Sequence, residues 1–183
     1  MFYYVVVVSV MEIKTYSCTG HRPHKLNQEY DYDGPCTKYV YKEILRILAE
    51  DSPDVCISGM AIGADTLFAL AALELEIPLI AALPFIGQEN RWPEKSKKIY
   101  REILNNPLTT KKVVSEGGYS AHKMHLRDMY MVDEADKVLA VFNGTKGGTY
   151  YTVKYAIKND VDIIYVDPDA WKEKDEEQLS LFD

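Results

Sequence analysis

Two glycine-containing segments of the sequence could hold an anion on backbone N–H groups. They are residues 58–65 (SGMAIGAD) and residues 143–149 (NGTKGGT). Glycine allows close backbone approach, and a helix starting at either segment would direct free N–H groups and its positive dipole end at a phosphate. Neither segment has the dinucleotide GxGxxG pattern or a Walker loop. Two such loops after different strands favour an anion site more strongly than one would. Asp65 would either complement the helix dipole or contact a ribose.

Residues 18–23 (CTGHRP) form a third candidate, because they directly follow the first expected strand. Gly20 permits a sharp turn, and the Arg22 guanidinium could bind phosphate or carboxylate with two parallel donors. The alternative is a plain turn with a surface charge. A second candidate anion partner is Arg127, which lies in an expected helix between the two glycine segments.

Residues 84–92 (PFIGQENRW) could bind a nucleobase, with Phe85 or Trp92 stacking on the ring and Gln88 donating hydrogen bonds. A packed surface loop anchored by Trp92 explains the same residues equally well.

Metal chemistry and nucleophilic hydrolysis are weaker interpretations. Cys18, His21 and His24 have ligand-like spacing, and His122 and His125 lie three residues apart on an expected helix. The first set spans a turn that needs no metal to explain it, so no metal or other certain cofactor is predicted. Neither a Gly-x-Ser-x-Gly elbow nor a recognisable catalytic cysteine context is present.

The elements that must position these loops alternate between short apolar runs and amphipathic stretches. We expect strands at residues 12–18, 54–57, 78–83, 111–115, 137–142 and 162–166, and helices at residues 38–50, 64–75, 95–105, 121–134 and 149–159. Such alternation predicts an α/β fold, a Rossmann-like three-layer sandwich with a mainly parallel sheet. Ligands of these folds bind at the carboxyl ends of the strands, where the loops above would gather.

The composition and length of the chain limit the possible fold classes, partners and locations. The 183 residues, 47% of them hydrophobic, suffice for one globular domain, which we expect over residues 11–170. The net charge of −7 argues against a broad nucleic-acid-binding surface. We interpret residues 1–10 as an apolar extension, too short for a membrane span and without the basic region of a secretory signal; the alternative is an extra strand added to the sheet. Three widely spaced cysteines imply no disulfide framework, so we expect a cytoplasmic protein with no membrane association.

Together, residues 18–23, 58–65, Gln88-x-x-x-Trp92 and Gly147-Gly148-Thr149 resemble the YpsA/YoqJ-type proteins of the SLOG superfamily, Rossmann-like domains related to the LOG and DprA proteins. The resemblance covers residues 11–168. It implies a nucleotide or nucleotide-derived, ADP-ribose-like ligand, with phosphate on the two glycine segments and its charge neutralised by Arg22 and Arg127. The ligand-site residues that follow are Thr19, Gly20, His21, Arg22, Ser58, Gly59, Met60, Gly63, Ala64, Asp65, Gln88, Trp92, Arg127, Gly144, Gly147, Gly148 and Thr149.

Two relatives suggest alternative functions. LOG proteins release a base from a nucleoside monophosphate, and residues 124–127 (MHLR) resemble their helix motif. The carboxylate of their second motif, however, falls on Thr152, so the resemblance implies binding more strongly than cleavage; Asp65, Asp128 or Glu116 would have to replace it. DprA proteins bind single-stranded DNA, which the acidic balance makes less favourable here.

The acidic tail, residues 171–183, ends in a segment that resembles the peptide by which bacterial replication and repair proteins bind the DNA sliding clamp. The matching residues are Gln178, Leu179, Ser180, Leu181 and Phe182. Leu181 and Phe182 would fill an apolar pocket of the clamp while the charged spacer stays extended. The alternative is that these apolar residues pack back on the domain or on a second copy in a homodimer.

Overall fold

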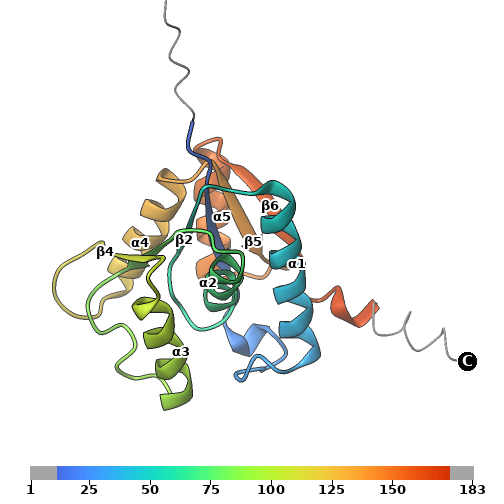
Figure 1. The fold of residues 1–183 in the computed structure, drawn as a ribbon, viewed down its shortest axis with the longest axis horizontal. Helices are drawn as coiled ribbons and strands as arrows, with labels where there is room; N and C mark the ends of the chain where they lie inside the picture. The colour runs from blue at the N-terminus through green and yellow to red at the C-terminus, as the bar shows by residue number, and fades with distance from the viewer. Residues whose placement is uncertain (1–11, 174–183) are drawn as a thin grey trace, which may run out of the picture.

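The computed structural model describes residues 12–173, which form a six-stranded sheet with helices on both faces (Figure 1). All strands are parallel, in the order β4-β3-β2-β1-β5-β6. Their bounds are β1 (Thr15–Gly20), β2 (Val55–Ser58), β3 (Leu79–Leu83), β4 (Thr109–Val113), β5 (Lys137–Val141) and β6 (Asp162–Val166). The predicted α/β, Rossmann-like fold is confirmed.

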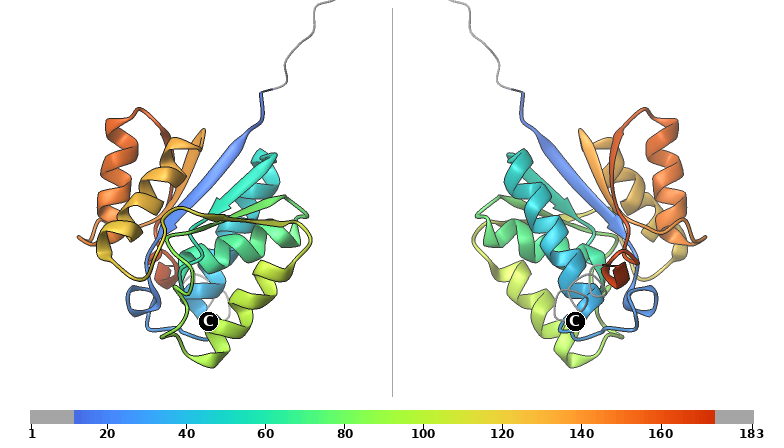
Figure 2. Two further views of the ribbon diagram at one scale, coloured as in Figure 1. Left: turned by 90° about the vertical axis from the view of Figure 1, so that its left-hand side faces the viewer. Right: turned by 90° about the vertical axis from the view of Figure 1, so that its right-hand side faces the viewer.

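Five α-helices and one short 3-10 helix connect the strands. They are η1 (Pro23–Lys25), α1 (Pro35–Asp51), α2 (Ala64–Glu74), α3 (Glu94–Asn105), α4 (Ala121–Asp133) and α5 (Gly148–Lys158). Helices α1, α2 and α3 cover one face of the sheet, whereas α4 and α5 cover the other (Figure 2). The molecule therefore has the three layers expected from the sequence.

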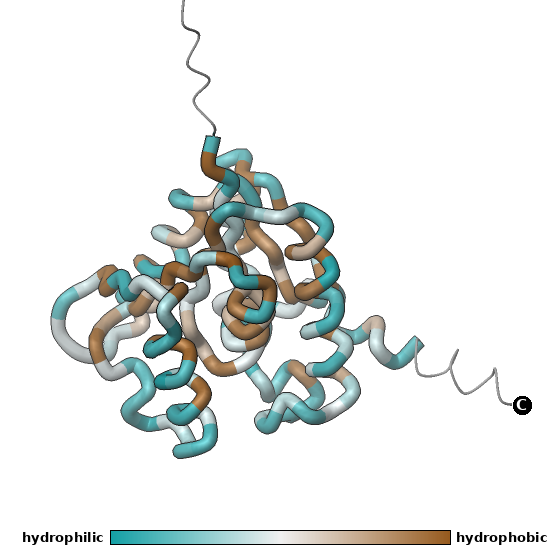
Figure 3. Tube along the Cα trace, in the orientation of Figure 1, coloured by the Kyte–Doolittle hydropathy of each residue, from teal (hydrophilic) through white to brown (hydrophobic). Residues whose placement is uncertain are grey.

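The main hydrophobic core lies between the sheet and the layer of α1, α2 and α3. Tyr16 and Cys18 of β1 enter this core, packing with Phe68 of α2 and Ile44 of α1. Helix α2 is buried on nearly all sides, and its alanines let the sheet and α1 approach it closely. Figure 3 shows this distribution, with hydrophobic segments at the centre of the molecule and hydrophilic ones around them.

Several element boundaries differ from the sequence-based prediction. Helix α1 begins at Pro35 rather than at residue 38, because proline favours the first helical position and Glu29 accepts hydrogen bonds from the backbone N–H groups of Cys36 (3.2 Å) and Thr37 (2.7 Å). Strand β4 lies two residues earlier than expected, and η1 was not predicted. Within residues 12–173, no helix is long and apolar enough to cross a membrane. The proposed extension, residues 1–10, and the clamp-binding motif, residues 178–182, lie outside the described part of the chain.

Candidate functional site

The loops after β1 and β2 interlock at the carboxyl edge of the sheet. The backbone N–H of Ala64 donates to the carbonyl of His21 (3.1 Å), and Gly63 N–H donates to the Tyr32 hydroxyl (3.0 Å). Gly63 has φ +110°, and a side chain there would collide with the His21 carbonyl. Gly63 and Ala64, which belong to the expected phosphate-binding segment, therefore also join the loop after β2 to the loop after β1.

Hydrogen bonds within the loop after β2 hold it in one conformation. Ser58 Oγ donates to the Asp65 carbonyl (2.7 Å) and accepts from Met60 N–H (3.1 Å). Thr66 Oγ1 donates to the Ala61 carbonyl (2.9 Å). Ser58 and Met60 are buried, so these two predicted site residues shape the loop from beneath rather than face a ligand.

Arg127 of α4 is buried and held by protein groups. Its Nη1 donates to the Gly59 carbonyl and lies 3.7 Å from Asp65 Oδ2, and its Nε donates to Asp128 Oδ1 (2.7 Å). A Cβ at Gly59 would collide with the guanidinium, so glycine is needed there to admit it. Arg127 thus connects α4 to the loop after β2, a role that the spacing of charges in the sequence did not reveal.

Asp65, at the first turn of α2, is buried close to both arginines. Burial raises the pKa of its carboxyl above the ordinary value, and the nearby Arg127 and Arg22 offset this only in part. Burial lowers the pKa of the Arg22 guanidinium, which the charge of Asp65 partly offsets.

The loop after β5 packs against the loop after β1. His21 Nε2 and Asn143 Oδ1 are 2.7 Å apart, and Asn143 Nδ2 donates to Asp169 Oδ2 (2.8 Å). Lys25 Nζ donates to Thr145 Oγ1 (2.9 Å). Burial lowers the pKa of His21, with a smaller opposing effect from its bond to Asn143. His21 is therefore a buried residue that fixes the two loops relative to each other.

Two adjoining cavities at this carboxyl edge share lining residues. The smaller, of about 280 Å³, is lined by Thr19, Gly20, Arg22, Ala61, Asp65, Met124, Arg127, Asp128, Gly148 and Thr149. The larger, of about 570 Å³, is lined by Arg22, Phe85, Ile86, Gly87, Gln88, Asn90, Arg91, Trp92, Gly118, Tyr119 and Met124. Arg22 and Met124 line both, so the two cavities meet at these side chains and form one two-part site.

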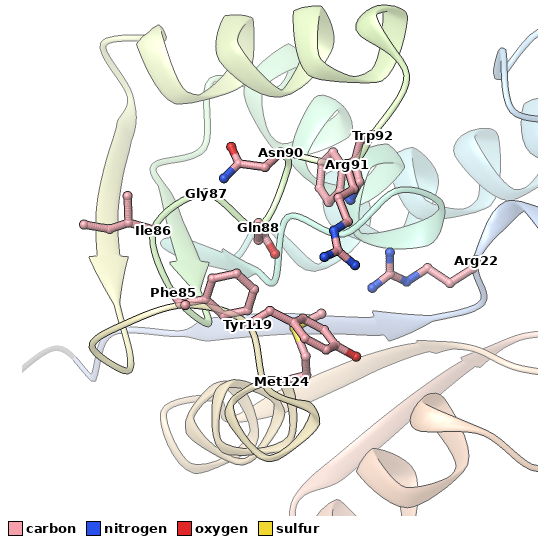
Figure 4. Close-up of a pocket in the computed structure, with 11 residues that line it drawn as sticks. Arg22, Phe85, Ile86, Gly87, Gln88, Asn90, Arg91, Trp92, Tyr119 and Met124 are labelled. Atoms are coloured by element: carbon pink, nitrogen blue, oxygen red, sulfur yellow. The ribbon is translucent and has the colours of Figure 1, made fainter.

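The two cavities differ in charge. In the smaller one, the positive charges of Arg22 and Arg127 are balanced by Asp65 and Asp128. The larger one has Arg22 and Arg91 and, among the residues described, no carboxylate in its lining. Figure 4 shows these two guanidinium groups pointing toward one another across the cavity. Because Arg22 is shared with the smaller cavity and its carboxylates, Arg91 is the positive charge that the larger cavity adds, and a cationic lining without a carboxylate favours an anionic ligand.

Aromatic rings line the rest of the larger cavity. Phe85 is buried and meets the edge of Tyr119 with 6.0 Å between ring centroids, whereas 74% of Tyr119 is exposed. Trp92 packs edge-on against Tyr100, at 5.3 Å between centroids, so it both lines the cavity and anchors its loop. Phe85 and Tyr119 can therefore offer a ligand an apolar wall.

The structure gathers about half of the predicted site residues around these two cavities. The predicted residues that line neither are His21, Ser58, Gly59, Met60, Gly63, Ala64, Gly144 and Gly147. Arg91, Tyr119 and Met124 are cavity residues that the sequence prediction missed. Arg91 lay within a loop already singled out, and Met124 within the LOG-like helix motif, but Tyr119 stands in an unpatterned segment after β4 and gave no signal.

The three carboxylates that the sequence offered for catalysis do not lie in one cavity. Asp65 and Asp128 line the smaller cavity and both lie beside Arg127, while Glu116 lines a third cavity, of about 670 Å³, which shares Ile86 with the larger one. Thr152 donates from Oγ1 to the Gly148 carbonyl of its own helix (3.2 Å). Among residues 12–173, no group of three or more histidine, cysteine, aspartate or glutamate side chains could hold a metal ion.

The chain is similar in sequence to a known protein family. The family model YpsA, described as the YspA SLOG family, matches residues 16–171. A UPF0398 protein of Bacillus pumilus (strain SAFR-032) is 28% identical over 93% of this chain and 97% of its own length. The SPbeta prophage-derived protein YoqJ of Bacillus subtilis (strain 168) is 32% identical over 56% of this chain and 68% of its own.

Solved structures share the fold at low sequence identity. DNA processing protein A of Streptococcus pneumoniae has a TM-score of 0.61 at 17% identity over 90% of this chain, and that of Helicobacter pylori, described with a single-stranded DNA binding mode, has 0.59 at 20% over 84%. The present chain spans only 56% and 65% of those two chains. A molybdenum cofactor binding protein of Rippkaea orientalis has a TM-score of 0.56 at 18% identity, covering 93% of this chain and 86% of that one.

Proposed function

The chain belongs to the YpsA SLOG family, and from this premise we propose that the two-part site binds a nucleotide-derived, ADP-ribose-like ligand. One observation carries the proposal. An aromatic cavity holding two arginines without a carboxylate meets, at Arg22, a smaller cavity bordered by the start of α5. A ligand with a base, phosphate and sugar matches an aromatic cavity, a pair of arginines and a smaller polar cavity that follow one another in space.

Each part of such a ligand has a complementary surface. The base would lie against Phe85 and Tyr119 in the larger cavity. Phosphate groups would lie between Arg22 and Arg91, whose forked donors suit phosphate oxygens. Sugar hydroxyls would enter the smaller cavity, where Asp65 and Asp128 can accept hydrogen bonds and the N–H groups of α5 can donate them.

Isothermal titration calorimetry of the full chain with ADP-ribose, ADP and AMP tests this. We expect binding of at least one, and a loss of about tenfold or more for Arg22→Gln and for Arg91→Gln, because each removes a charged donor from the phosphate position. Arg46→Gln is the matched control, since Arg46 is exposed on α1 and pairs with Glu50 there. Absence of measurable heat with all three compounds would refute the proposal.

We expect this function to be binding rather than LOG-type cleavage, because Thr152 stands at the position of the carboxylate in the LOG motif and its hydroxyl donates to the helix backbone. Prolonged incubation with AMP at high protein concentration, followed by chromatography, should yield no adenine. Release of adenine that is lost in Asp128→Asn would instead establish an enzyme.

A second function rests on the sequence of the tail. We propose that residues 178–182 bind the bacterial DNA sliding clamp, because all five positions match the clamp-binding peptide. An immobilised clamp should retain the full chain and the control Glu176→Gln but not Leu181→Ala/Phe182→Ala. Equal retention of all three would refute this interaction.

A further inference from the structure

Strand β4 forms one edge of the sheet. Its inner side pairs with β3, and its outer side has no neighbouring strand in the described part of the chain. Lys111 and Lys112 lie on this strand with exposed side chains, and neither forms an ion pair with any residue that the structure describes. Like charges directly opposite each other destabilise strand pairs, so two copies of β4 pair poorly with each other, whereas an acidic strand suits this edge.

The third cavity lies at the carboxyl end of β4. Its lining is Ile86, Val113, Val114, Ser115, Glu116 and Gly117. Ile86 is 79% exposed and Val113 is 40% exposed, so apolar surface is open to solvent beside the cavity. Exposed apolar groups gathered around a hollow are typical of a surface that binds another chain. Along its length, β4 therefore offers positive charge first and an apolar cavity second.

The tail of the chain carries complementary groups in the same order. Residues 175–177 (DEE) are acidic, and residues 179–182 (LSLF) include three apolar side chains. Over residues 174–183, one lysine and four acidic residues give a net charge of −3. If this segment ran parallel to β4, its acidic residues would lie beside the two lysines and its apolar residues at the third cavity. Alternate side chains of a strand share one face, so both leucines would point the same way.

The β4 strand of the same molecule is out of reach of the tail. The described chain ends at Glu173, after β6 and on the side of α1, whereas β4 lies on the opposite side of the molecule (Figure 1). Strands β4 and β6 are the two edges of the sheet, five strand spacings or about 24 Å apart. Residues 175–177 follow Glu173 within four residues, which span at most about 14 Å. The lysines that these acidic residues could meet therefore belong to another molecule.

We propose that β4 of one copy binds residues 174–183 of a second copy as an added parallel strand, so that the chain associates with itself through its tail. Main-chain hydrogen bonds extend the sheet, the lysines pair with the acidic residues, and the apolar residues cover the third cavity. The other edge strand, β6, begins with Asp162 and contains no lysine, so charge does not favour the tail there. Because the proposed clamp-binding motif lies in the same segment, self-association competes with clamp binding.

Sedimentation equilibrium of the full chain tests this inference. We expect self-association with a Kd of about 100 µM or tighter, weakened by added salt because charge pairing contributes to it. Lys111→Glu/Lys112→Glu should weaken the association about tenfold or more, since it places like charges together. Lys154→Glu/Lys158→Glu is the matched control, because it makes the same charge change at exposed positions of α5 and should leave the association unchanged.

A charge exchange makes the test specific to this pairing. Asp175→Lys/Glu176→Lys/Glu177→Lys should also weaken the association about tenfold or more, and combining it with the variant of the two β4 lysines should restore the Kd to within about threefold of the wild type. The tail variant lies outside residues 12–173, so it provides an independent test if the β4 variant does not fold in thermal unfolding. A chain that stays monomeric, or an association that survives both variants or is not restored by their combination, overturns the inference. All these variants leave residues 178–182 unchanged, so the clamp proposal is decided separately.

Discussion

Replacing Arg127 should destabilise the fold far more than replacing its partner Asp65. The Arg127 side chain is 5% exposed; it forms ion pairs with Asp65 and Asp128 and donates a hydrogen bond to the Gly59 carbonyl. Removing the cation from a buried pair leaves uncompensated charge, which costs about 3–5 kcal/mol. We therefore expect Arg127→Met to lower the free energy of unfolding by about that amount at pH 7.

Asp65 should behave differently because burial already disfavours its charged form. Its pKa in the folded state lies above the ordinary value of 3.8, so the folded chain holds this proton more tightly than the unfolded chain. The stabilisation from that proton is present below the unfolded pKa and is lost as the pH rises through the folded pKa. Asp65→Asn removes this cost at pH 7 and still accepts from Ala61 N–H, so we expect a change of less than about 1.5 kcal/mol.

Urea unfolding of both single variants and the double variant completes the test. Asp65→Asn should rescue at least about 1 kcal/mol of the loss in Arg127→Met, because it neutralises the orphaned charge. Arg101→Met is the matched control: Arg101 lies 3.7 Å from Glu94, the same separation as the buried pair, but is 59% exposed, and its loss should cost less than about 1 kcal/mol. If Arg127→Met costs no more than this control, or if the double variant shows no rescue, the reasoning is wrong.

Three further predictions concern packing, pH and thiol reactivity. A Cβ on Gly20 would lie 2.8 Å from the Cβ of Val141 in β5 and closer still to the Cβ of Ala64 in α2. Gly20→Ala should therefore lower the free energy of unfolding in urea by about 1–3 kcal/mol. Gly118→Ala, which has open space around it, should lower it by less than about 0.5 kcal/mol. Burial lowers the pKa of His21, so the free energy of unfolding should fall as the pH drops below 6.5, by at most about 1.4 kcal/mol per pH unit. His21→Gln should make the free energy of unfolding less dependent on pH in this range, and an unchanged dependence contradicts the prediction. Burial raises the pKa of the Cys36 and Cys56 thiols to about 12, so both should react with a thiol reagent only on unfolding, and rapid native labelling would count against the structure.

Much of the fold followed from the sequence because it depends on local, periodic signals. Apolar runs of four to six residues alternate with longer amphipathic stretches, and that alternation specifies parallel strands joined by helices. Boundaries were less predictable. The start of α1 depends on Glu29, which reaches its first turn from a preceding loop, and β4 is an exposed edge strand whose lysines carry no burial pattern.

The sequence by itself predicted four of the loops that border the candidate site, but not the segment after β4 that supplies Tyr119. Parallel strands bring their carboxyl ends to one edge, so the segments after β1, β2, β3 and β5 had to gather there. Which side chains face the cavities was decided only by the tertiary structure. Arg22 and Arg127 look equivalent in the sequence, yet one opens into both cavities and the other is enclosed by two carboxylates and a backbone carbonyl. The physical reason is that a charge's role depends on which groups surround it, and those groups come from segments far apart in the chain.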